Sequence, residues 1–557
     1  STLSSSSAAS DVYKRQIKRR CEAHHASVHT LNPTQKTVLT YTLPHRSTVV
    51  LKRNFNLMLR LLILGLFAII TAACGTTPAL QQSKQRSTSE IQIELNRMGH
   101  NQWLAQYRLT KPIRALAFIT APQLKRRENW SIDSAFEWSL IDRHEVLMRK
   151  DGLAFDQVSV SFAGSEQWMR KEYTFTQTIE DENLIFYSGH LQTLPIANRR
   201  ENTIALADID AALEREIRIA LTAHARHDEH VFDDHGKATS TLHVDLSHKP
   251  DSANSPYLYF GVRHPVDVNG MKIMVQRDIP AWLNTAFMEQ FETIGRYYQK
   301  NLAGSLSQPV MVYLNKKGNA EGMTSFNGGV AGNAIQLTVE GNGWQLYSTE
   351  NFNQLMHLFA HELAHVWNGK LIYNTEQPEA AWIHEGGADL LKDRALLDLN
   401  IIDRMQFEQS ILRSFSDCQM NWGDISLLDN HKFGQYQLNY SCGEVIQYFA
   451  ARAAYPTDAA PEITLWRGFI TKQLASGKYT SQDLYDLLDK ENPRISKVIA
   501  DLVASTEAKS RMTLWQQLAG LAGLGFVTLD NDPSHYQTKQ TQSLLRDIMA
   551  ADCQSQY

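Results

Sequence analysis

The chain contains 557 residues, of which 43% are hydrophobic, 20% charged and 9% aromatic. This balance is typical of roughly two to four domains with ordinary cores, and it excludes a wholly disordered, collagenous or multi-span membrane protein. The net charge of −4, from 55 Lys and Arg against 59 Asp and Glu, gives no electrostatic basis for binding nucleic acid.

The N-terminal region is predicted to contain two segments that precede the working protein. Residues 1–57 are Ser-rich and basic, contain no methionine and show no helical or strand periodicity, so we expect them to be a non-native upstream segment. Met58 is the first possible initiator. Residues 58–73 have the charged start, short apolar run and small residues of a secretory signal peptide. The apolar run is shorter than the ~20 residues that a membrane span needs.

Cys74 directly follows two alanines, an arrangement that resembles the lipobox of bacterial lipoproteins, whose cysteine is lipidated. The resemblance implies a protein of the bacterial envelope, anchored by lipid and facing the periplasm or the surface. Residues 74–90 are then expected to be a flexible tether. Thr71 stands where that motif usually has leucine, so ordinary secretion with an unmodified Cys74 is the alternative.

Residues 91–265 alternate apolar and polar side chains in short runs, a pattern typical of β-strands. We therefore expect a β-rich domain of sandwich or saddle form. The stretch 224–235 within it contains four histidines, which could hold a metal ion but are better explained as a solvated loop.

The pattern changes to mixed strands and helices near residue 278. A helix is expected after Pro280, followed by strands over 310–314 and 334–339, with a Gly-rich loop at 328–332 between them. A further helix is predicted from about 350 to 367. Helical patterns then continue to the C-terminus, where the apolar stretch 514–526 is expected to pack in a core rather than bind a membrane.

The sequence HELAH at residues 361–365 carries the chemistry. His361 and His365 are four residues apart in a predicted helix, so both imidazoles lie on one face and can bind a single metal ion. Glu362 lies beside them, where it can take a proton from a metal-bound water. Zinc suits such ligands and lowers the pKa of bound water to about 7. His357 continues the series, but successive turns diverge too far for one ion, so we expect it to support the site or to pack.

The sequence WIHEGGAD at residues 382–389 supplies a third ligand. Glu385 can complete a zinc site that leaves one position open for water, and His384 is the alternative ligand. Asp389, one turn later, can accept the free ring N–H of a ligating histidine. The two glycines after Glu385 permit close approach of another helix.

Together, HELAHVWNGK and WIHEGGAD resemble the gluzincin metallopeptidases, nearest the aminopeptidase N and glycyl aminopeptidase types. The resemblance implies that His361, His365 and Glu385 bind one Zn²⁺ and that Glu362 is the general base for peptide-bond hydrolysis. The spacing from His365 to Glu385 is one residue longer than in the aminopeptidase N pattern and much shorter than in the glycyl aminopeptidase pattern. The subfamily therefore stays open.

The resemblance also implies a fold. We expect an α+β chain with an N-terminal β-rich domain, a thermolysin-like catalytic domain and a C-terminal helical domain. The expected bounds are 91–265, 266–452 and 453–557, respectively.

Tyr440 opens the sequence YSCG at residues 440–443. In the resembling families, a tyrosine ahead of such a turn stabilises the oxyanion, which implies the same catalytic role for Tyr440. The alternatives are a structural tyrosine, or Tyr436 in its place.

Gly328, Gly329 and Asn333 belong to the Gly-rich loop, and we expect them to bind the substrate, which could add to the neighbouring strand as a β-strand. The resembling aminopeptidases carry a glutamate in this loop that holds the substrate's amino group. This chain has no acid there, so aminopeptidase and endopeptidase action are both open.

Cys418 and Cys442 lie 24 positions apart in the helical region, and we predict a disulfide between them that holds the segment presenting Tyr440. Free thiols, or a pairing that involves Cys553, are the alternatives.

The expected function is that of a zinc metallopeptidase whose partners are a peptide or protein substrate and, through the lipid, the membrane. Two alternatives are a non-catalytic zinc-binding envelope lipoprotein and the same zinc site acting on a non-peptide bond. The intact Glu362 argues against the first alternative, because a scaffold has no need of a base.

Overall fold

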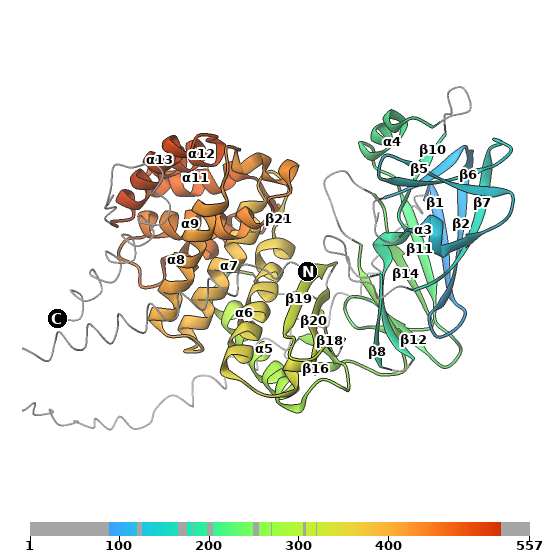
Figure 1. Cartoon of the computed structure of the whole chain (residues 1–557), viewed down its shortest axis with the longest axis horizontal. Coiled ribbons are helices and arrows are strands. Elements are labelled where there is room, and N and C mark those ends of the chain that lie inside the picture. Colours follow the sequence, from blue (N-terminus) through green and yellow to red (C-terminus); the bar gives the residue numbers. More distant parts are fainter. Residues whose placement is uncertain are drawn as a thin grey trace, which may run out of the picture. The chain divides into compact units, whose positions relative to one another are not determined.

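The computed structural model describes residues 89–524, except 120–124, 165–174, 181, 198–203, 249–254, 269, 305–307, 319 and 333. The expected signal peptide, the lipidated Cys74 and nearly all of the tether lie outside these described residues, as do Asn333 and Cys553. Strands dominate the first half of the described chain and helices the second half (Figure 1).

Three sheets form the N-terminal part, which agrees with the expected β-rich domain. In order of pairing, the first sheet contains β14 (Thr241–Asp245), β11 (Ile219–His224), β1 (Ile91–Arg97), β2 (Gln102–Ile113), β7 (Phe155–Ala163) and β4 (Trp130–Ile132). The second contains β10 (Thr193–Ile196), β3 (Ala115–Phe118), β6 (His144–Arg149) and β5 (Phe136–Ile141). The third contains β13 (Ala238–Thr239), β12 (His230–Phe232), β15 (Tyr257–Gly261), β9 (Asn183–Tyr187) and β8 (Thr176–Glu180). Two short helices, α3 (Arg126–Asn129) and α4 (Leu206–Leu213), and the 3₁₀ turn η1 (Ser188–Leu191) connect the strands.

The strands form where side chains alternate between core and solvent. In β1, the alternate residues Ile91, Ile93 and Leu95 are buried, while the residues between them are partly or fully exposed. Aromatic rings also pack between the sheets: Trp103 of β2 contacts Phe186 of β9, with ring centroids 4.8 Å apart. This alternation is the signal that identified the β-rich domain in the sequence.

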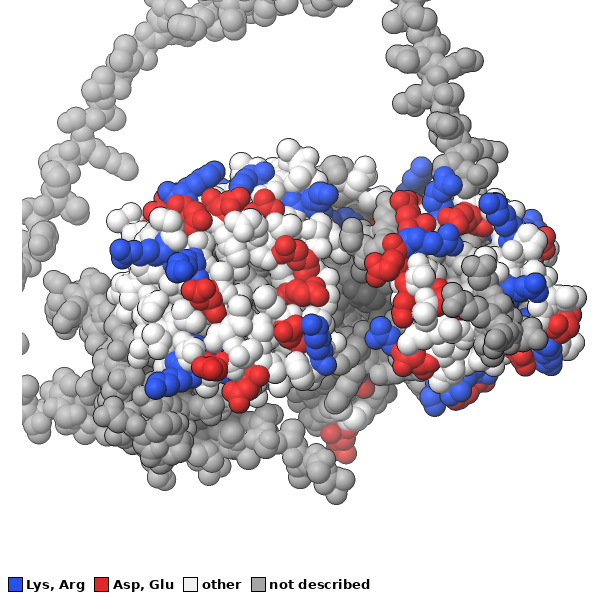
Figure 2. All heavy atoms as spheres, turned by 90° about the horizontal axis from the view of Figure 1, so that it is seen from above, with Lys and Arg blue, Asp and Glu red and all other residues white. Residues whose placement is uncertain are grey.

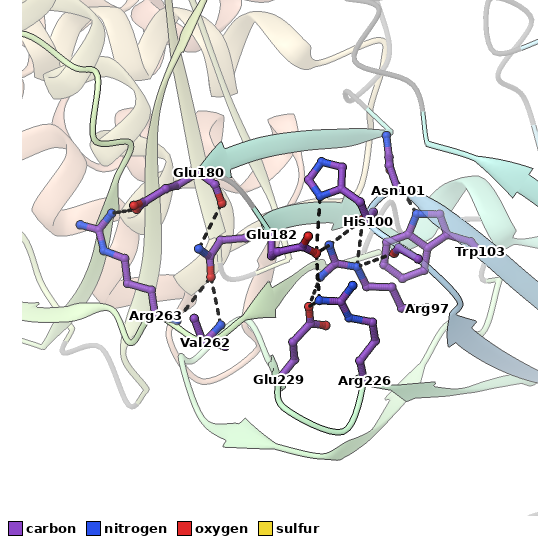
Figure 3. Close-up of polar contacts among 12 residues, drawn as sticks. Arg97, His100, Asn101, Trp103, Glu180, Glu182, Arg226, Glu229, Val262 and Arg263 are labelled. Carbon is purple, nitrogen blue, oxygen red and sulfur yellow. Dashed lines mark hydrogen bonds and ion pairs between the residues drawn. The ribbon is translucent and has the colours of Figure 1, made fainter.

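A buried ion-pair cluster joins β1, the β8–β9 turn and the segment before β12 (Figure 3). Arg97 Nη1 donates to Glu229 Oε1 over 2.9 Å, and both side chains are fully buried. Arg226 Nη2 lies 2.7 Å from the same oxygen and 2.8 Å from Glu182 Oε2. Burial lowers the pKa of the Arg97 guanidinium, although Glu229 opposes this effect. Because buried charges need such partners, the cluster fixes how these three segments meet.

The histidines of the 224–235 stretch do not converge on one point. His224 Nε2 lies 2.7 Å from Glu94 Oε2, and His235 Nδ1 lies 3.3 Å from the carbonyl oxygen of Pro309. Within the described residues, the cluster able to hold a metal ion contains none of these histidines. His224 and His235 therefore make structural contacts, whereas His227 and His230 are exposed, so the expected solvated loop describes only part of this stretch.

A five-stranded sheet begins the region in which the thermolysin-like domain was expected. In order of pairing it contains β16 (Val266–Val268), β17 (Met271–Val275), β18 (Val310–Lys317), β20 (Ala334–Glu340) and β19 (Ser325–Ala331). The central pairs are parallel, whereas the edge strands β16 and β19 are antiparallel to their neighbours. The prediction of a Gly-rich loop at 328–332 was wrong, because Gly328 and Gly329 lie inside β19. Glycine in a strand commonly marks close approach of another group, and here that group is Glu362, described below.

Helices form the rest of the described chain. In chain order they are α5 (Ala281–Asn301), η2 (Asn342–Gln345), α6 (Thr349–His365), the π-helical segment η3 (Val366–Leu371), α7 (Ala381–Asp398), α8 (Arg404–Asn421), η4 (Leu427–Phe433), α9 (Gln437–Ala454), α10 (Pro461–Gln473), α11 (Ser481–Glu491), α12 (Pro493–Ala504) and α13 (Ala508–Leu521). The short strands β21 (Tyr373–Asn374) and β22 (Lys478–Tyr479) pair and join the segment after η3 to the C-terminal helices.

One hydrophobic core runs from the five-stranded sheet through these helices, from Met271 to Ala522. Almost every residue of α9 is buried, and the expected domain boundary at 452/453 falls inside this helix. The regions on the two sides of this expected boundary therefore share a core. Trp515 and Leu518 of α13 belong to it, which supports core packing for the described part of the apolar stretch at 514–526.

Lys and Arg side chains are interspersed with Asp and Glu side chains over the face that Figure 2 shows. Mixed charge of this kind creates no strong local field of one sign. Among the described residues, no helix is both long enough and apolar enough to cross a lipid bilayer.

Candidate metal centre and active site

Helix α6 presents the two histidines at its C-terminal end. Ser348 caps the N-terminus by accepting a hydrogen bond from the backbone N–H of Asn351 over 3.0 Å. The apolar face of α6 packs into the core, and Phe359 is fully buried there. This packing fixes the rotation of the helix, so that His361 and His365 face α7.

The predicted metal ligands converge on one point. His361 Nε2 and His365 Nε2 lie 3.0 Å apart. Glu385 Oε2 lies 3.6 Å from the first nitrogen and 3.3 Å from the second. One ligand atom from each residue can be chosen so that all three lie within 4.8 Å of one another.

Hydrogen bonds on the far side of each ring fix the orientation of the histidines. His361 Nδ1 lies 2.9 Å from Asp389 Oδ1, and His365 Nδ1 lies 3.1 Å from Asn368 Oδ1. Both acceptors favour a proton on Nδ1, which leaves the Nε2 lone pairs for a metal ion. The sequence predicted Asp389 but not Asn368. Asn368 lies three residues after His365, about one helical turn, and this spacing was the feature of the sequence that could have identified it.

This donor set fits zinc. Two imidazole nitrogens and one carboxylate oxygen are the ligands of many catalytic zinc sites, which keep a fourth position open. Glu385 Oε2 is buried and completes no hydrogen bond of normal geometry with the described residues. A buried carboxylate oxygen without such a bond is costly, and a cation between the three groups would remove that cost.

The charges around the ligands also favour a cation. Burial opposes protonation of His361, but Asp389, Glu385 and Glu362 together outweigh burial and raise the pKa of His361 to about 10. Burial would raise the pKa of Glu385, yet His365 and His361 hold it well below its usual range. The site therefore stabilises positive charge at its centre and a carboxylate beside it.

His384, the alternative third ligand, does not join the ligand cluster. Its ring stacks on that of His365, with centroids 4.2 Å apart and planes inclined by 27°. Its Nδ1 lies 3.4 Å from the carbonyl oxygen of Asn368. Burial and the neighbouring His365 lower the pKa of His384 to about 3, so the ring is neutral. The His384 ring therefore packs against His365 and limits its movement.

Helices α6 and α7 meet through two parallel His–Asp pairs, which Lys392 joins. His361 faces Asp389, and one turn earlier His357 Nδ1 lies 3.2 Å from Asp393 Oδ1. Lys392 Nζ lies 2.7 Å from Asp389 Oδ1 and 3.5 Å from Asp393 Oδ1. Burial disfavours the lysine charge, but the two aspartates outweigh burial and raise the pKa of Lys392. His357 therefore has the supporting position that we expected.

Glu362 lies between α6 and the edge strand β19. A Cβ atom on Gly328 would lie only 2.4 Å from Glu362 Oε1, so any side chain at position 328 would displace the carboxylate. Burial raises the pKa of Glu362, which makes its carboxylate a stronger base. The structure thus brings Glu362 and Gly328 together beside the metal ligands, and Gly329 follows in the same strand.

Tyr440 reaches the site from α9. Its ring lies 5.7 Å from that of His361, with the planes inclined by 26°. The Glu385 carboxylate, together with burial, raises the pKa of Tyr440, so the phenol keeps its proton and can donate a hydrogen bond. Tyr436 is 41% exposed and immediately precedes the first residue of the helix. The expected turn after Tyr440 is wrong, because YSCG is already helical.

Glycines allow α7 and α9 to cross with their backbones in contact. A Cβ atom on Gly386 would lie 2.2 Å from the carbonyl carbon of Gly443, and one on Gly443 would lie 2.2 Å from the carbonyl oxygen of Trp382. A Cβ atom on Gly387 would lie 2.0 Å from Cζ2 of Trp466. The close helix approach predicted from the glycines is therefore present, and it places Glu385 and Tyr440 beside one another.

Cys418 of α8 and Cys442 of α9 are bonded in the structure, with their Cα atoms 4.8 Å apart. Both are fully buried. The bond joins α8 to α9 within two residues of Tyr440, which is the connection that the sequence predicted.

Asp234 brings an acid to the end of β19 from the β-rich part. Its Oδ2 lies 3.0 Å from the position that a Cβ atom on Gly332 would occupy. Its negative charge also favours the charged form of Lys370, whose pKa burial lowers. The sequence gave no signal for this approach, because Asp234 and Gly332 are almost a hundred residues apart.

No family model matches the chain, and no curated protein matches its sequence. The structure is similar to an aminopeptidase N family protein from Idiomarina loihiensis, with a TM-score of 0.53 and 14% identity over 76% of this chain and 78% of that one. It also matches yeast LTA4 hydrolase (TM-score 0.45, 11% identity, 75% of this chain and 68% of that one). A further match is an M1 zinc metallopeptidase from Deinococcus radiodurans (TM-score 0.42, 9% identity, 75% and 94%).

The first of these similarities shows a shared fold. The chain therefore has the α+β fold of aminopeptidase N family proteins, and the expected architecture is confirmed: a β-rich part, a thermolysin-like catalytic region and C-terminal helices.

Proposed function

We propose that the protein is a zinc-dependent metallopeptidase. The observation that supports this proposal most is the convergence of the His361, His365 and Glu385 ligand atoms beside the carboxylate of Glu362. A fold shared with an aminopeptidase N family protein supports it further.

The residues around this centre have the positions that peptide hydrolysis requires. A bound zinc ion would polarise the scissile carbonyl and acidify water. Glu362 takes the proton of the attacking water and returns it to the leaving amine, and its raised pKa suits both steps. Tyr440 donates a hydrogen bond to the developing oxyanion. The free edge of β19 offers backbone groups to an extended peptide.

Replacing Glu362 with glutamine tests the proposal. Glu362→Gln should bind one zinc ion per chain like the parent, as measured by metal analysis, while cleavage of a broad peptide mixture falls by about 10²- to 10⁴-fold. Glu289→Gln, an exposed change on α5, serves as the matched control. Equal turnover by Glu362→Gln and the parent would refute the mechanism. Zinc binding without cleavage by the parent would instead favour the scaffold, or action on a non-peptide bond.

Aminopeptidase action is the form of this function that Asp234 favours. Its carboxylate lies at the end of β19, where the Gly-rich segment itself has no acid, and it could hold a substrate's terminal ammonium group. Asp234→Asn should then raise KM for peptides with a free N-terminus and leave cleavage of N-acetylated peptides unchanged. An equal effect on both classes of peptide would favour endopeptidase action.

We also propose that the protein is a lipid-anchored component of the bacterial envelope. The support is sequence alone: the signal-like segment 58–73 followed by Cys74. Cys74→Ser should release the protein from membranes or leave it unprocessed. Full membrane retention of a correctly cleaved Cys74→Ser protein would contradict the anchor.

A further inference from the structure

A polar cavity of about 160 Å³ lies between β8 of the β-rich part and the five-stranded sheet. Amide and hydroxyl side chains dominate its lining, including Gln177, Thr178, Gln276, Asn327 and Thr338. Gln177 is buried and hydrogen-bonded to Gln336 of β20 at the inner side, whereas Phe326 and Asn327 of β19 are exposed. The cavity therefore opens at the free edge of β19.

The register of β19 relates this cavity to the metal centre. Gly328 faces α6, because a side chain there would meet Glu362. Side chains alternate along a strand, so Asn327 faces the opposite side, where it lies across from Thr338 of β20 in the cavity lining. A peptide that adds to β19 alternates in the same way. The peptide residue opposite Gly328 faces Glu362, and its neighbour opposite Asn327 faces the cavity.

The chemistry of the cavity favours an uncharged polar side chain. Asn315 does not line the cavity but lies beside it, opposite Thr338 on the same face of the sheet; it is fully buried, and neither polar atom of its amide has a hydrogen-bond partner among the described residues. Lys316, Lys317 and Glu340 also line the cavity. Lys317 lies opposite Glu340 across β18 and β20, and Lys316 Nζ lies 4.0 Å from Asp278 Oδ2, so each lysine already has an acidic group nearby. A cavity of about 160 Å³ has room for an amide side chain.

We propose that this cavity is a specificity subsite for asparagine or glutamine in the substrate, at a position directly flanking the residue that is cleaved. The inference rests on the proposed peptidase function. An amide both donates and accepts hydrogen bonds, as the lining does, and an apolar side chain of equal size would leave the lining unpaired.

Peptide sets that differ at one position test the subsite in the full-length zinc enzyme. Each set varies one flanking position on either side of the cleaved bond among Gln, Glu, Lys, Leu and Met. The parent should cleave the Gln peptide about tenfold faster, in kcat/KM, than the Met peptide at one of these positions. Thr338→Val, which preserves size, should reduce this ratio roughly 3- to 10-fold, and Gln177→Leu should reduce it as well. Gln157→Leu, an exposed change on β7, should leave it unchanged.

The outcomes separate this inference from the proposed function. If the parent cleaves the peptides without preferring Gln at either flanking position, the subsite is refuted and the peptidase function stands. An unchanged preference in folded Thr338→Val also refutes it. If no peptide is cleaved at all, the peptidase function fails and the subsite fails with it.

Discussion

Replacing Lys392 with methionine should destabilise the fold and weaken zinc binding, although the lysine touches no ligand of the metal. Its Nζ lies between two buried carboxylates, 2.7 Å from Asp389 and 3.5 Å from Asp393. Methionine fills nearly the same space, so the change removes the charge without opening a cavity. Removing one partner of a buried ion pair costs about 3–5 kcal/mol, and because the lysine side chain is 13% exposed we expect the lower end, about 3 kcal/mol.

The effect on zinc follows from Asp389. Lys392 contributes most to holding the pKa of Asp389 below its usual value, against the effect of burial. Without it, Asp389 binds a proton more readily and accepts the His361 N–H less well. Losing such an outer hydrogen bond typically weakens metal binding 10- to 100-fold. Competition with a chelator measures this affinity, and guanidinium unfolding of the zinc-free protein measures the stability.

Two further variants make the test specific. Lys490→Met removes an exposed lysine on α11 and should change neither quantity. Adding Asp393→Asn to Lys392→Met removes one of the two carboxylates that lose the lysine as a partner, and it should recover part of the lost stability. A Lys392→Met protein within about 1 kcal/mol of the parent, with unchanged zinc affinity, would show that the lysine does not hold the His–Asp pairs.

Three further changes test other parts of the site. Tyr440→Phe should lower kcat about 10²- to 10³-fold with little change in KM, whereas the control Tyr436→Phe should leave kcat unchanged. Steady-state kinetics measure both effects. Equal kcat values for the two variants would show that Tyr440 is not the oxyanion donor. Gly386→Ala should lower the free energy of unfolding by at least about 3 kcal/mol, because the new Cβ atom would overlap the α9 backbone. The control Gly520→Ala should not lower it, because no atom lies within contact distance of a Cβ atom there. Equal stabilities of the two variants in chemical unfolding would mean that α7 and α9 can move apart. Burial would raise the pKa of Asp393, but the charge of Lys392 and the neighbouring His357 hold it well below its usual range. The ionised Asp393 therefore stabilises the fold at pH values above its pKa in the unfolded chain, and this stabilisation is lost as the pH falls. Between pH 6 and pH 3, the free energy of unfolding of the parent should fall by on the order of 2 kcal/mol more than that of Asp393→Asn. Parallel plots of unfolding free energy against pH for the two proteins would contradict this.

The sequence predicted the pairing of His361 and His365 on one helix face because that geometry is local. Four residues of α6 set the separation of His361 and His365, and any helix places such residues on one face. The β-rich domain was likewise visible from alternation within single strands. Interactions that depend on contact between distant segments were not visible: Lys392 between two aspartates, and Asp234 beside Gly332.

Glycine accounts for the two errors at the site. Gly328 and Gly329 suggested a loop because glycine is depleted in strands, but the apolar strand β20 pairs with this segment along its whole length. Gly443 suggested a turn after Tyr440, yet it lies within α9 because the neighbouring helix leaves no space for a side chain. In both places glycine is needed because another group packs against the backbone in the folded protein. It is not needed for a turn or loop conformation.

The contact between Gly386 and Gly443 also provides a criterion for recognising distant relatives of this chain. At 14% identity, overall sequence similarity no longer identifies proteins that share the fold. A related chain in which the α7 carboxylate stays close to the α9 phenol must also have glycine at the positions equivalent to Gly386 and Gly443, because a larger residue at either position separates the two helices. A search for HExxH that also requires paired glycines after the third ligand and three residues after the tyrosine should therefore select chains in which the phenol can reach the oxyanion. Chains with the metal motif and a bulky residue at either position should have lost this tyrosine or replaced it with a longer donor.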